Sequence, residues 1–146
     1  MLNKKNHRKF RKVLYIIIFI VYIVIVLYIT LFNRVTSVRL KMLTPFWEYK
    51  QLIYGVDKLY WFRQIVCNII MLLPLGTFLC LMYRRLNAIH IGAIGCAFSS
   101  CIELTQYVTG RGLLEFDDIF HNTLGAVIGY IIMKRLLMRI NKMSEK

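Results

Sequence analysis

An uncharged apolar run near the start of the chain constrains the fold more than any other feature. It extends from Val13 to Phe32 and is rich in Ile, Val and Tyr. A helix needs about 20 apolar residues to cross a bilayer, so this run has the length of a membrane span. The basic residues before it also fit a signal peptide, but the run is long for one and no small-residue cleavage site follows. We therefore expect a retained span.

Three further apolar runs have the same length. They cover roughly Ile65–Tyr83, Ala88–Val108 and Ile119–Met138. With 58% hydrophobic residues gathered in long runs, the composition is typical of an integral membrane protein and not of a soluble core. The sequence thus predicts an all-α membrane protein with four transmembrane helices in residues 13–138, between basic tails at 1–12 and 139–146.

The positive charge predicts the orientation. The formal net charge is +13, and thirteen of the twenty Lys and Arg residues lie in the N-terminal tail, the connection between the second and third runs, and the C-terminal end. Positive residues favour the cytoplasmic side, so we expect both termini to be cytoplasmic. Because the charges lie at the ends of apolar runs, they do not indicate a nucleic-acid-binding surface.

The segment between the first two runs, residues 33–64, is rich in aromatic residues. It contains Pro45-Phe46-Trp47-Glu48-Tyr49 and Tyr60-Trp61-Phe62, and Trp and Tyr favour the headgroup level of a membrane. We expect either a short helix at the outer interface or an aromatic belt before the second span.

Polar side chains from separate parts of the chain are predicted to converge at the outer ends of these spans. Ionisable groups in or beside a span are costly and usually mark a polar network or a site. With both termini inside, the candidate residues all fall at the level of the outer leaflet: Arg34, Asn68, Glu103, Gln106, Arg111, Asp117, Asp118 and Asn122.

Two interpretations of this cluster remain open. In the structural one, Glu103 pairs with Arg111 or Arg34, Asp118 caps a helix, and the asparagines form bonds between helices. In the functional one, the cluster forms a polar pocket open to the outer leaflet. His121 lies in the same region, and we expect it to form a hydrogen bond at a helix end.

Small residues in the last run indicate close helix packing. Gly125 and Gly129 form a GxxxG motif, which lets helices approach closely. The same motif also allows a homodimer.

The order of these motifs resembles the VanZ-like family of membrane proteins. Asn68-x5-Pro74-x-Gly76 is similar to one block of that family. A second block of the family is matched by residues of this chain in the same order: Glu103-x-x-Gln106, Gly110-Arg111, Asp117-Asp118 and Asn122-x-x-Gly125. Arg34 matches an early arginine, and the resemblance covers roughly residues 13–133.

The resemblance implies a bacterial cell-membrane protein associated with glycopeptide resistance, in particular to teicoplanin. We expect partners among membrane lipids, a lipid-linked cell-wall precursor or the glycopeptide itself. We expect no catalytic residue, metal or cofactor, because no metal-spacing motif or nucleophile with a paired base is evident.

Two alternatives remain. One is a membrane enzyme acting on a lipid or wall precursor, with Glu103, Asp117, Asp118 and His121 as metal ligands or acid-base groups. The other is a small lipid transporter, although the chain has few spans and no inverted repeat.

Overall fold

The computed structural model describes residues 4–32, 39–83 and 85–144, and most of these are helical. The predicted site residue Arg34 lies outside the described residues. The helices and strands are α1 (Lys4–Leu27), a π-helix η1 (Tyr28–Phe32) that continues α1, β1 (Lys41–Met42), α2 (Trp47–Tyr54), α3 (Lys58–Met82), α4 (Ala88–Thr109), β2 (Leu114–Glu115) and α5 (Phe116–Ser144).

Three helices in the described part of the chain are long and apolar enough to cross a membrane. They are Lys9–Phe32, Lys58–Met82 and Ala88–Thr109, which contain the first three predicted spans almost entirely. The predicted fourth span is not among them. Its residues do form a helix, α5, but His121, Asn122, Lys134 and Arg135 reduce the hydropathy of that helix.

The closest helix packing is between α3 and α5, and glycines make it possible. A Cβ added to Gly125 would overlap the carbonyl oxygen of Ile69, and one added to Gly129 would overlap that of Leu73. Gly76 of α3 lies equally close to the backbone of α5 at Ala126. The GxxxG motif therefore packs against α3 of its own chain, and this face of α5 is not open to a second copy.

Helix α1 packs beside α3 and presents its other face outward. The Phe19 ring stacks on Phe78 with centroids 3.8 Å apart, and the Tyr22 hydroxyl donates to the carbonyl oxygen of Met71 at 2.7 Å. Ile17, Val24 and many other large apolar side chains of α1 are exposed. An apolar surface of this extent fits contact with lipid.

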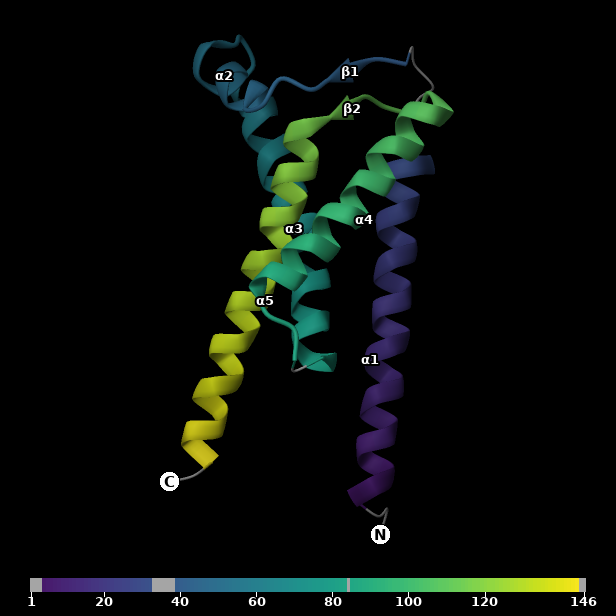
Figure 1. Ribbon diagram of the computed structural model, residues 1–146, viewed down its shortest axis with the longest axis vertical. Helices are drawn as coiled ribbons and strands as arrows, with labels where there is room; N and C mark the ends of the chain where they lie inside the picture. Colours follow the sequence, from purple (N-terminus) through teal and green to yellow (C-terminus); the bar gives the residue numbers. More distant parts are fainter. Residues whose placement is uncertain (1–3, 33–38, 84, 145–146) are drawn as a thin grey trace.

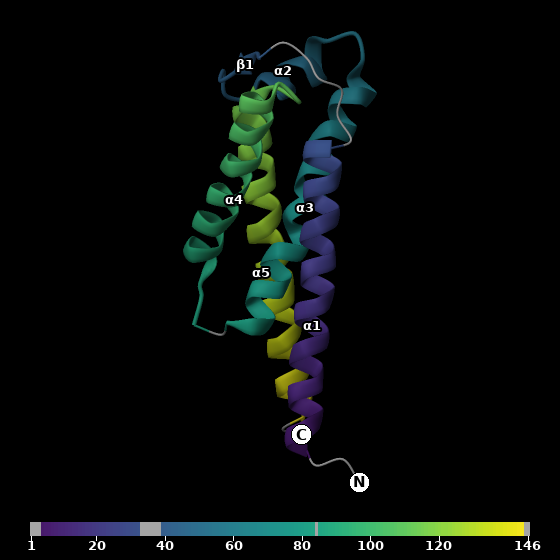
Figure 2. The ribbon, with the colours of Figure 1, turned by 90° about the vertical axis from the view of Figure 1, so that its right-hand side faces the viewer.

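Residues 39–57, just before α3, form a small cap over one end of the bundle (Figure 1). Its strand β1 pairs in parallel with β2, with Lys41 opposite Leu114 and Met42 opposite Glu115. The cap also contains the short helix α2, which confirms a helix in this segment, while its place at the outer interface stays a prediction. The start of α1 and the end of α5 both lie at the opposite end of the bundle, apart from each other (Figures 1 and 2).

Candidate functional site

Buried polar side chains from five helices meet at the capped end of the bundle. Such groups are costly to bury unless they are hydrogen-bonded or bind something. They are Thr30 of η1, Glu48 of α2, Asn68 of α3, Ser99, Glu103 and Gln106 of α4, and Asp117, Asp118, His121 and Asn122 of α5. We call this set the polar cluster. Of the predicted site residues that the structure describes, it contains all but Arg111.

Two side-chain hydrogen bonds join α5 to its neighbours. The Asn68 amide donates to the Asp118 carboxylate, which links α3 to α5. The Asn122 amide donates to the Ser99 hydroxyl at 2.9 Å, which links α4 to α5. These bonds agree with the structural interpretation, in which the two asparagines form bonds between helices. Asp118 was expected to cap a helix in that interpretation, and it accepts from a side chain of α3.

Gln106 connects α4 to the π-helix. Its amide donates to the backbone carbonyl of Thr30 at 2.9 Å, and the Thr30 hydroxyl donates to the carbonyl of Val26 at 2.8 Å. A π-helical turn offsets the regular carbonyl positions and is frequent at functional sites. Here it brings a backbone acceptor within reach of a side chain on α4.

Arg111 is positioned by the turn that ends α4. Gly110 has a φ of 67°, a left-handed conformation that favours glycine, and the Arg111 N–H donates to the Gln106 carbonyl at 2.9 Å. The half-buried guanidinium donates to the carbonyl of Leu31 at 3.2 Å and lies over the Phe32 ring. The turn thus folds Arg111 back toward the bundle, and these two contacts are with the end of η1.

Glu103 holds the loop after α4. Its carboxylate accepts the backbone N–H of Glu115 at 3.0 Å, next to the strand pair that joins this loop to β1. Of its two expected partners, Arg34 lies outside the described residues, and Arg111 contacts Leu31 and Phe32.

Asp117 anchors the cap. Its two carboxylate oxygens accept the backbone N–H groups of Phe46 at 2.7 Å and Glu48 at 2.8 Å, at the start of α2. A carboxylate suits a helix N-terminus because it satisfies free N–H groups and complements the helix dipole. The bonds stabilise a left-handed Phe46 with a φ of 61°. Asp117 was predicted to belong to the site, and its contacts here fasten α2 to α5.

Helix α2 brings Glu48 and Tyr49 to His121, a contact that sequence reasoning missed. His121 is fully buried, its Nδ1 lies 3.1 Å from a Glu48 oxygen, and its Nε2 lies 3.0 Å from the Tyr49 hydroxyl. Burial, together with the nearby Asp117 and Glu48 carboxylates, raises the pKa of Tyr49. Tyr49 therefore stays protonated, and its hydroxyl lies within hydrogen-bonding distance of His121 Nε2.

A cavity of about 180 Å³ lies within the polar cluster. Its wall combines carboxylates and amides with a few apolar groups, from Ile29, Thr30, Gln64, Cys67, Asn68, Met71, Glu103, Gln106, Asp118 and Asn122. Two buried acceptors of this wall, Gln106 Oε1 and Asn122 Oδ1, have no hydrogen-bond partner among the described residues. Buried acceptors are rarely left unpaired in native proteins, so the cavity is suited to a ligand that donates hydrogen bonds.

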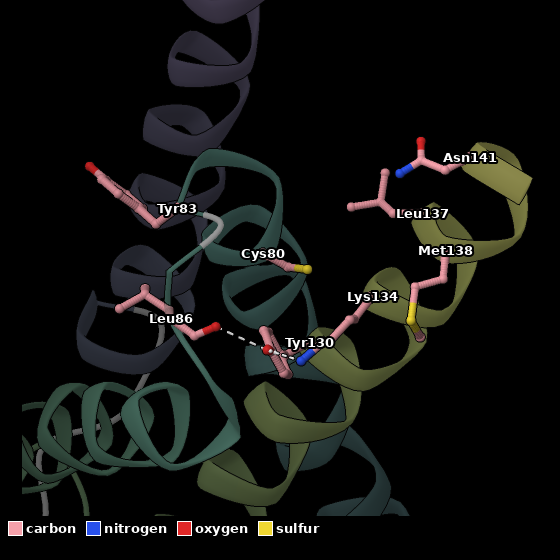
Figure 3. A pocket seen from close by; sticks show the side chains of 8 residues that line it. All are labelled: Cys80, Tyr83, Leu86, Tyr130, Lys134, Leu137, Met138 and Asn141. Carbon is pink, nitrogen blue, oxygen red and sulfur yellow. Dashed lines mark hydrogen bonds between the residues drawn. The ribbon is translucent and has the colours of Figure 1, made fainter. Parts of the chain in front are cut away.

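A second cavity, of about 220 Å³, lies between the end of α3, the α3–α4 connection at Leu86, and α5, toward the end where α5 terminates (Figure 3). The Lys134 ammonium donates to the Tyr130 hydroxyl at 3.0 Å, and that hydroxyl donates to the Leu86 carbonyl at 3.0 Å. These polar groups satisfy one another, so they tie the α3–α4 connection to α5 and do not indicate a ligand.

The fold and the polar cluster define a small helical membrane protein with a buried polar site at one end. The chain matches the model of the VanZ/LLP1 family over residues 19–139 and belongs to that family. Comparisons with curated proteins and with solved structures find no match. The family confirms the resemblance seen in the motifs around Asn68, Glu103 and Asp118.

Proposed function

We propose that this protein holds a polar headgroup of a lipid or lipid-linked cell-wall precursor in the cavity of the polar cluster. Binding there modulates susceptibility to glycopeptide antibiotics such as teicoplanin. The observation that carries the proposal is the pair of buried unpaired acceptors, Gln106 Oε1 and Asn122 Oδ1, in one polar cavity. An acceptor left buried and unpaired costs about 1–3 kcal/mol, and a bound donor removes that cost.

The size and chemistry of the cavity limit the ligand. A volume of about 180 Å³ equals that of about six water molecules. It therefore fits an ammonium group or part of a sugar, and a whole glycopeptide is far too large. The described wall contains Glu103 and Asp118 and no basic residue, so hydroxyl and ammonium donors suit it better than phosphate does. This supports a precursor or lipid, and not the antibiotic, as the occupant.

We also propose that α5 is a fourth span in a bacterial cell membrane, with both termini cytoplasmic and the polar cluster outside. The polar residues in the first two turns of α5, including Asp118, His121 and Asn122, are buried against other helices, so they need not face lipid. Topology reporters fused after residue 144 test the orientation, and an extracellular C-terminus would refute it.

Substitutions that remove the unpaired acceptors test the headgroup proposal. In cells expressing the protein, we expect Asn122→Leu and Gln106→Leu to abolish a protective effect against teicoplanin and to reduce co-purified lipid detected by mass spectrometry. Thr77→Val is the matched control, because Thr77 is half-buried between α3 and α5 and does not line this cavity. Full protection by both leucine variants, at normal membrane levels, would refute the proposal.

One observation favours the alternative of a membrane enzyme. The His121 imidazole lies between the buried Glu48 carboxylate and the Tyr49 hydroxyl. Its Nδ1 is 3.1 Å from a Glu48 oxygen, and its Nε2 is 3.0 Å from the Tyr49 hydroxyl oxygen. A carboxylate that orients an imidazole beside a hydroxyl can support general-base chemistry. If this is the function, Tyr49→Phe abolishes turnover of labelled lipid precursors by the purified protein while retaining the fold. If wild-type protein shows no turnover, the enzyme alternative is wrong.

A further inference from the structure

An apolar groove lies along the same seam of the bundle as the cavity of the polar cluster. It has a volume of about 180 Å³ and lies between α1 and α3. Its wall is almost entirely apolar and is formed mainly by Ile18, Phe19, Tyr22, Pro74, Phe78 and Leu81. The cavity of the polar cluster is bordered by η1, which continues α1, and by α3. Both therefore occupy the seam where α1 runs beside α3 (Figure 2).

One face of α3 forms a wall of both. Positions 64, 67, 68 and 71 border the cavity of the polar cluster, and positions 74, 77, 78 and 81 border the α1–α3 groove. These positions recur at intervals of three or four residues, so they fall on a single stripe of the helix. The stripe changes from polar at Gln64 and Asn68 to apolar at Phe78 and Leu81. A stripe of this kind matches a molecule with one polar end and one apolar end.

The cavity and the groove adjoin at the contact between Tyr22 and Met71. Met71 borders the cavity and Pro74 borders the groove, and three residues of a helix span about 4.5 Å. Tyr22 borders the groove, and its hydroxyl donates to the Met71 carbonyl at 2.7 Å. On the same side of the seam, Ile29 and Thr30 follow about two turns after Tyr22 and border the cavity. A single molecule placed along the seam therefore reaches both.

Hydrocarbon is the medium that surrounds the groove. Both of its helices are long and apolar enough to cross a membrane, over Lys9–Phe32 and Lys58–Met82. Ile18, in the wall, is 56% exposed, so the groove is open toward that medium. Left empty, an apolar groove loses the dispersion contacts that its walls would make with an occupant. A helix about 10 Å across is too wide for a groove of about 180 Å³, whereas one hydrocarbon chain fits it.

We propose that the ligand of the polar cluster is an acyl-chain lipid, with its headgroup in the cavity and one acyl chain in the α1–α3 groove. This inference rests on the proposed function and adds to it the apolar part of the ligand. The headgroup donates hydrogen bonds, because Gln106 Oε1 and Asn122 Oδ1 are buried acceptors without a partner among the described residues. A hydroxyl or a primary ammonium group donates, whereas choline has no N–H or O–H. An unbranched acyl chain suits a groove of this size better than a methyl-branched polyprenyl chain.

Photo-crosslinking of the full-length protein in phosphatidylcholine nanodiscs tests this placement. Two probes have donor headgroups, phosphatidylethanolamine and glucosyl-diacylglycerol, and each carries a diazirine in the middle of one acyl chain. A phosphatidylcholine probe with the same chain is the reference for lipid that merely surrounds the protein. We expect at least one donor probe to label residues 15–22 and 74–81 more than the reference does. Unlabelled donor lipid should remove the excess, and polyprenyl phosphate should not.

Two substitutions separate the two ends of the ligand. Ile18→Trp fills the groove with an indole ring, and Asn122→Leu removes a headgroup acceptor in the cavity. Because one molecule occupies both places, each substitution should abolish the excess labelling of the seam. Val24→Trp is the matched control and should retain the excess. Val24 is 60% exposed, close to the 56% of Ile18, and borders neither the cavity nor the groove.

The outcomes distinguish this inference from the proposed function. If Asn122→Leu abolishes the excess and Ile18→Trp does not, the chain lies elsewhere, so the inference is wrong while the proposed function stands. If Ile18→Trp alone abolishes it, or if polyprenyl phosphate displaces the probe, no acyl lipid joins the groove to the cavity and the inference is wrong. Equal labelling by all probes on the wild type also overturns it and needs no variant. The proposed function then depends on its own test, the lipid lost from Asn122→Leu and Gln106→Leu.

Discussion

Gly125 provides a sharp test of how α3 and α5 pack. A methyl group at this position overlaps the carbonyl oxygen of Ile69, which is backbone and cannot rotate away. Gly125→Ala therefore forces the two helices apart. Gly92→Ala is the matched control, because a methyl group there meets only the Val127 side chain at an ordinary 3.5 Å. Both substitutions gain the same helix propensity, about 1 kcal/mol, so their difference isolates the packing cost.

The expected difference in stability follows from the cost of overpacking, about 1–3 kcal/mol. For a chain of this size, 1 kcal/mol shifts the melting temperature by about 2–4 °C. A cost of about 2 kcal/mol thus predicts that Gly125→Ala melts about 4–8 °C below Gly92→Ala. Thermal unfolding of both variants in the same detergent measures this. Equal melting temperatures would refute the close α3–α5 approach at Gly125.

Three other predictions concern the capped end. Asp117→Ala removes two charge-assisted hydrogen bonds to the start of α2, each worth about 1.5–3 kcal/mol, so trypsin should cleave at the exposed Lys50 faster than in the wild type. Ser99→Ala leaves the buried Asn122 amide without its acceptor and should cost about 1–3 kcal/mol in chemical denaturation. The raised pKa of Tyr49 contributes stability that is complete below about pH 10 and is lost as the pH rises through the folded value. Tyr49→Phe should therefore lose less stability than the wild type above pH 10, and equal losses would contradict the pKa shift.

The sequence alone determined the parts of the fold that depend on local hydropathy. Three long apolar runs predicted three helices that are apolar enough to cross a membrane, and the start of α4 at Ala88 was predicted at the correct residue. It also located most of the polar cluster, because polar groups such as Glu103 and Asp118 stand out beside apolar runs. The spacing of Gly125 and Gly129 predicted close packing without identifying the partner helix.

Only the tertiary structure decided which groups meet. Glu48 lies in an aromatic segment whose sequence resembles an interfacial belt, and its burial depends on α2 docking through Asp117, some 70 positions away in the chain. Local hydropathy cannot detect a contact at that sequence separation. The same holds for the start of α5, where His121 and Asn122 lower the hydropathy of the helix and are buried against other helices. Local chemistry thus determined the helices and the composition of the site, and packing determined which of its polar groups meet.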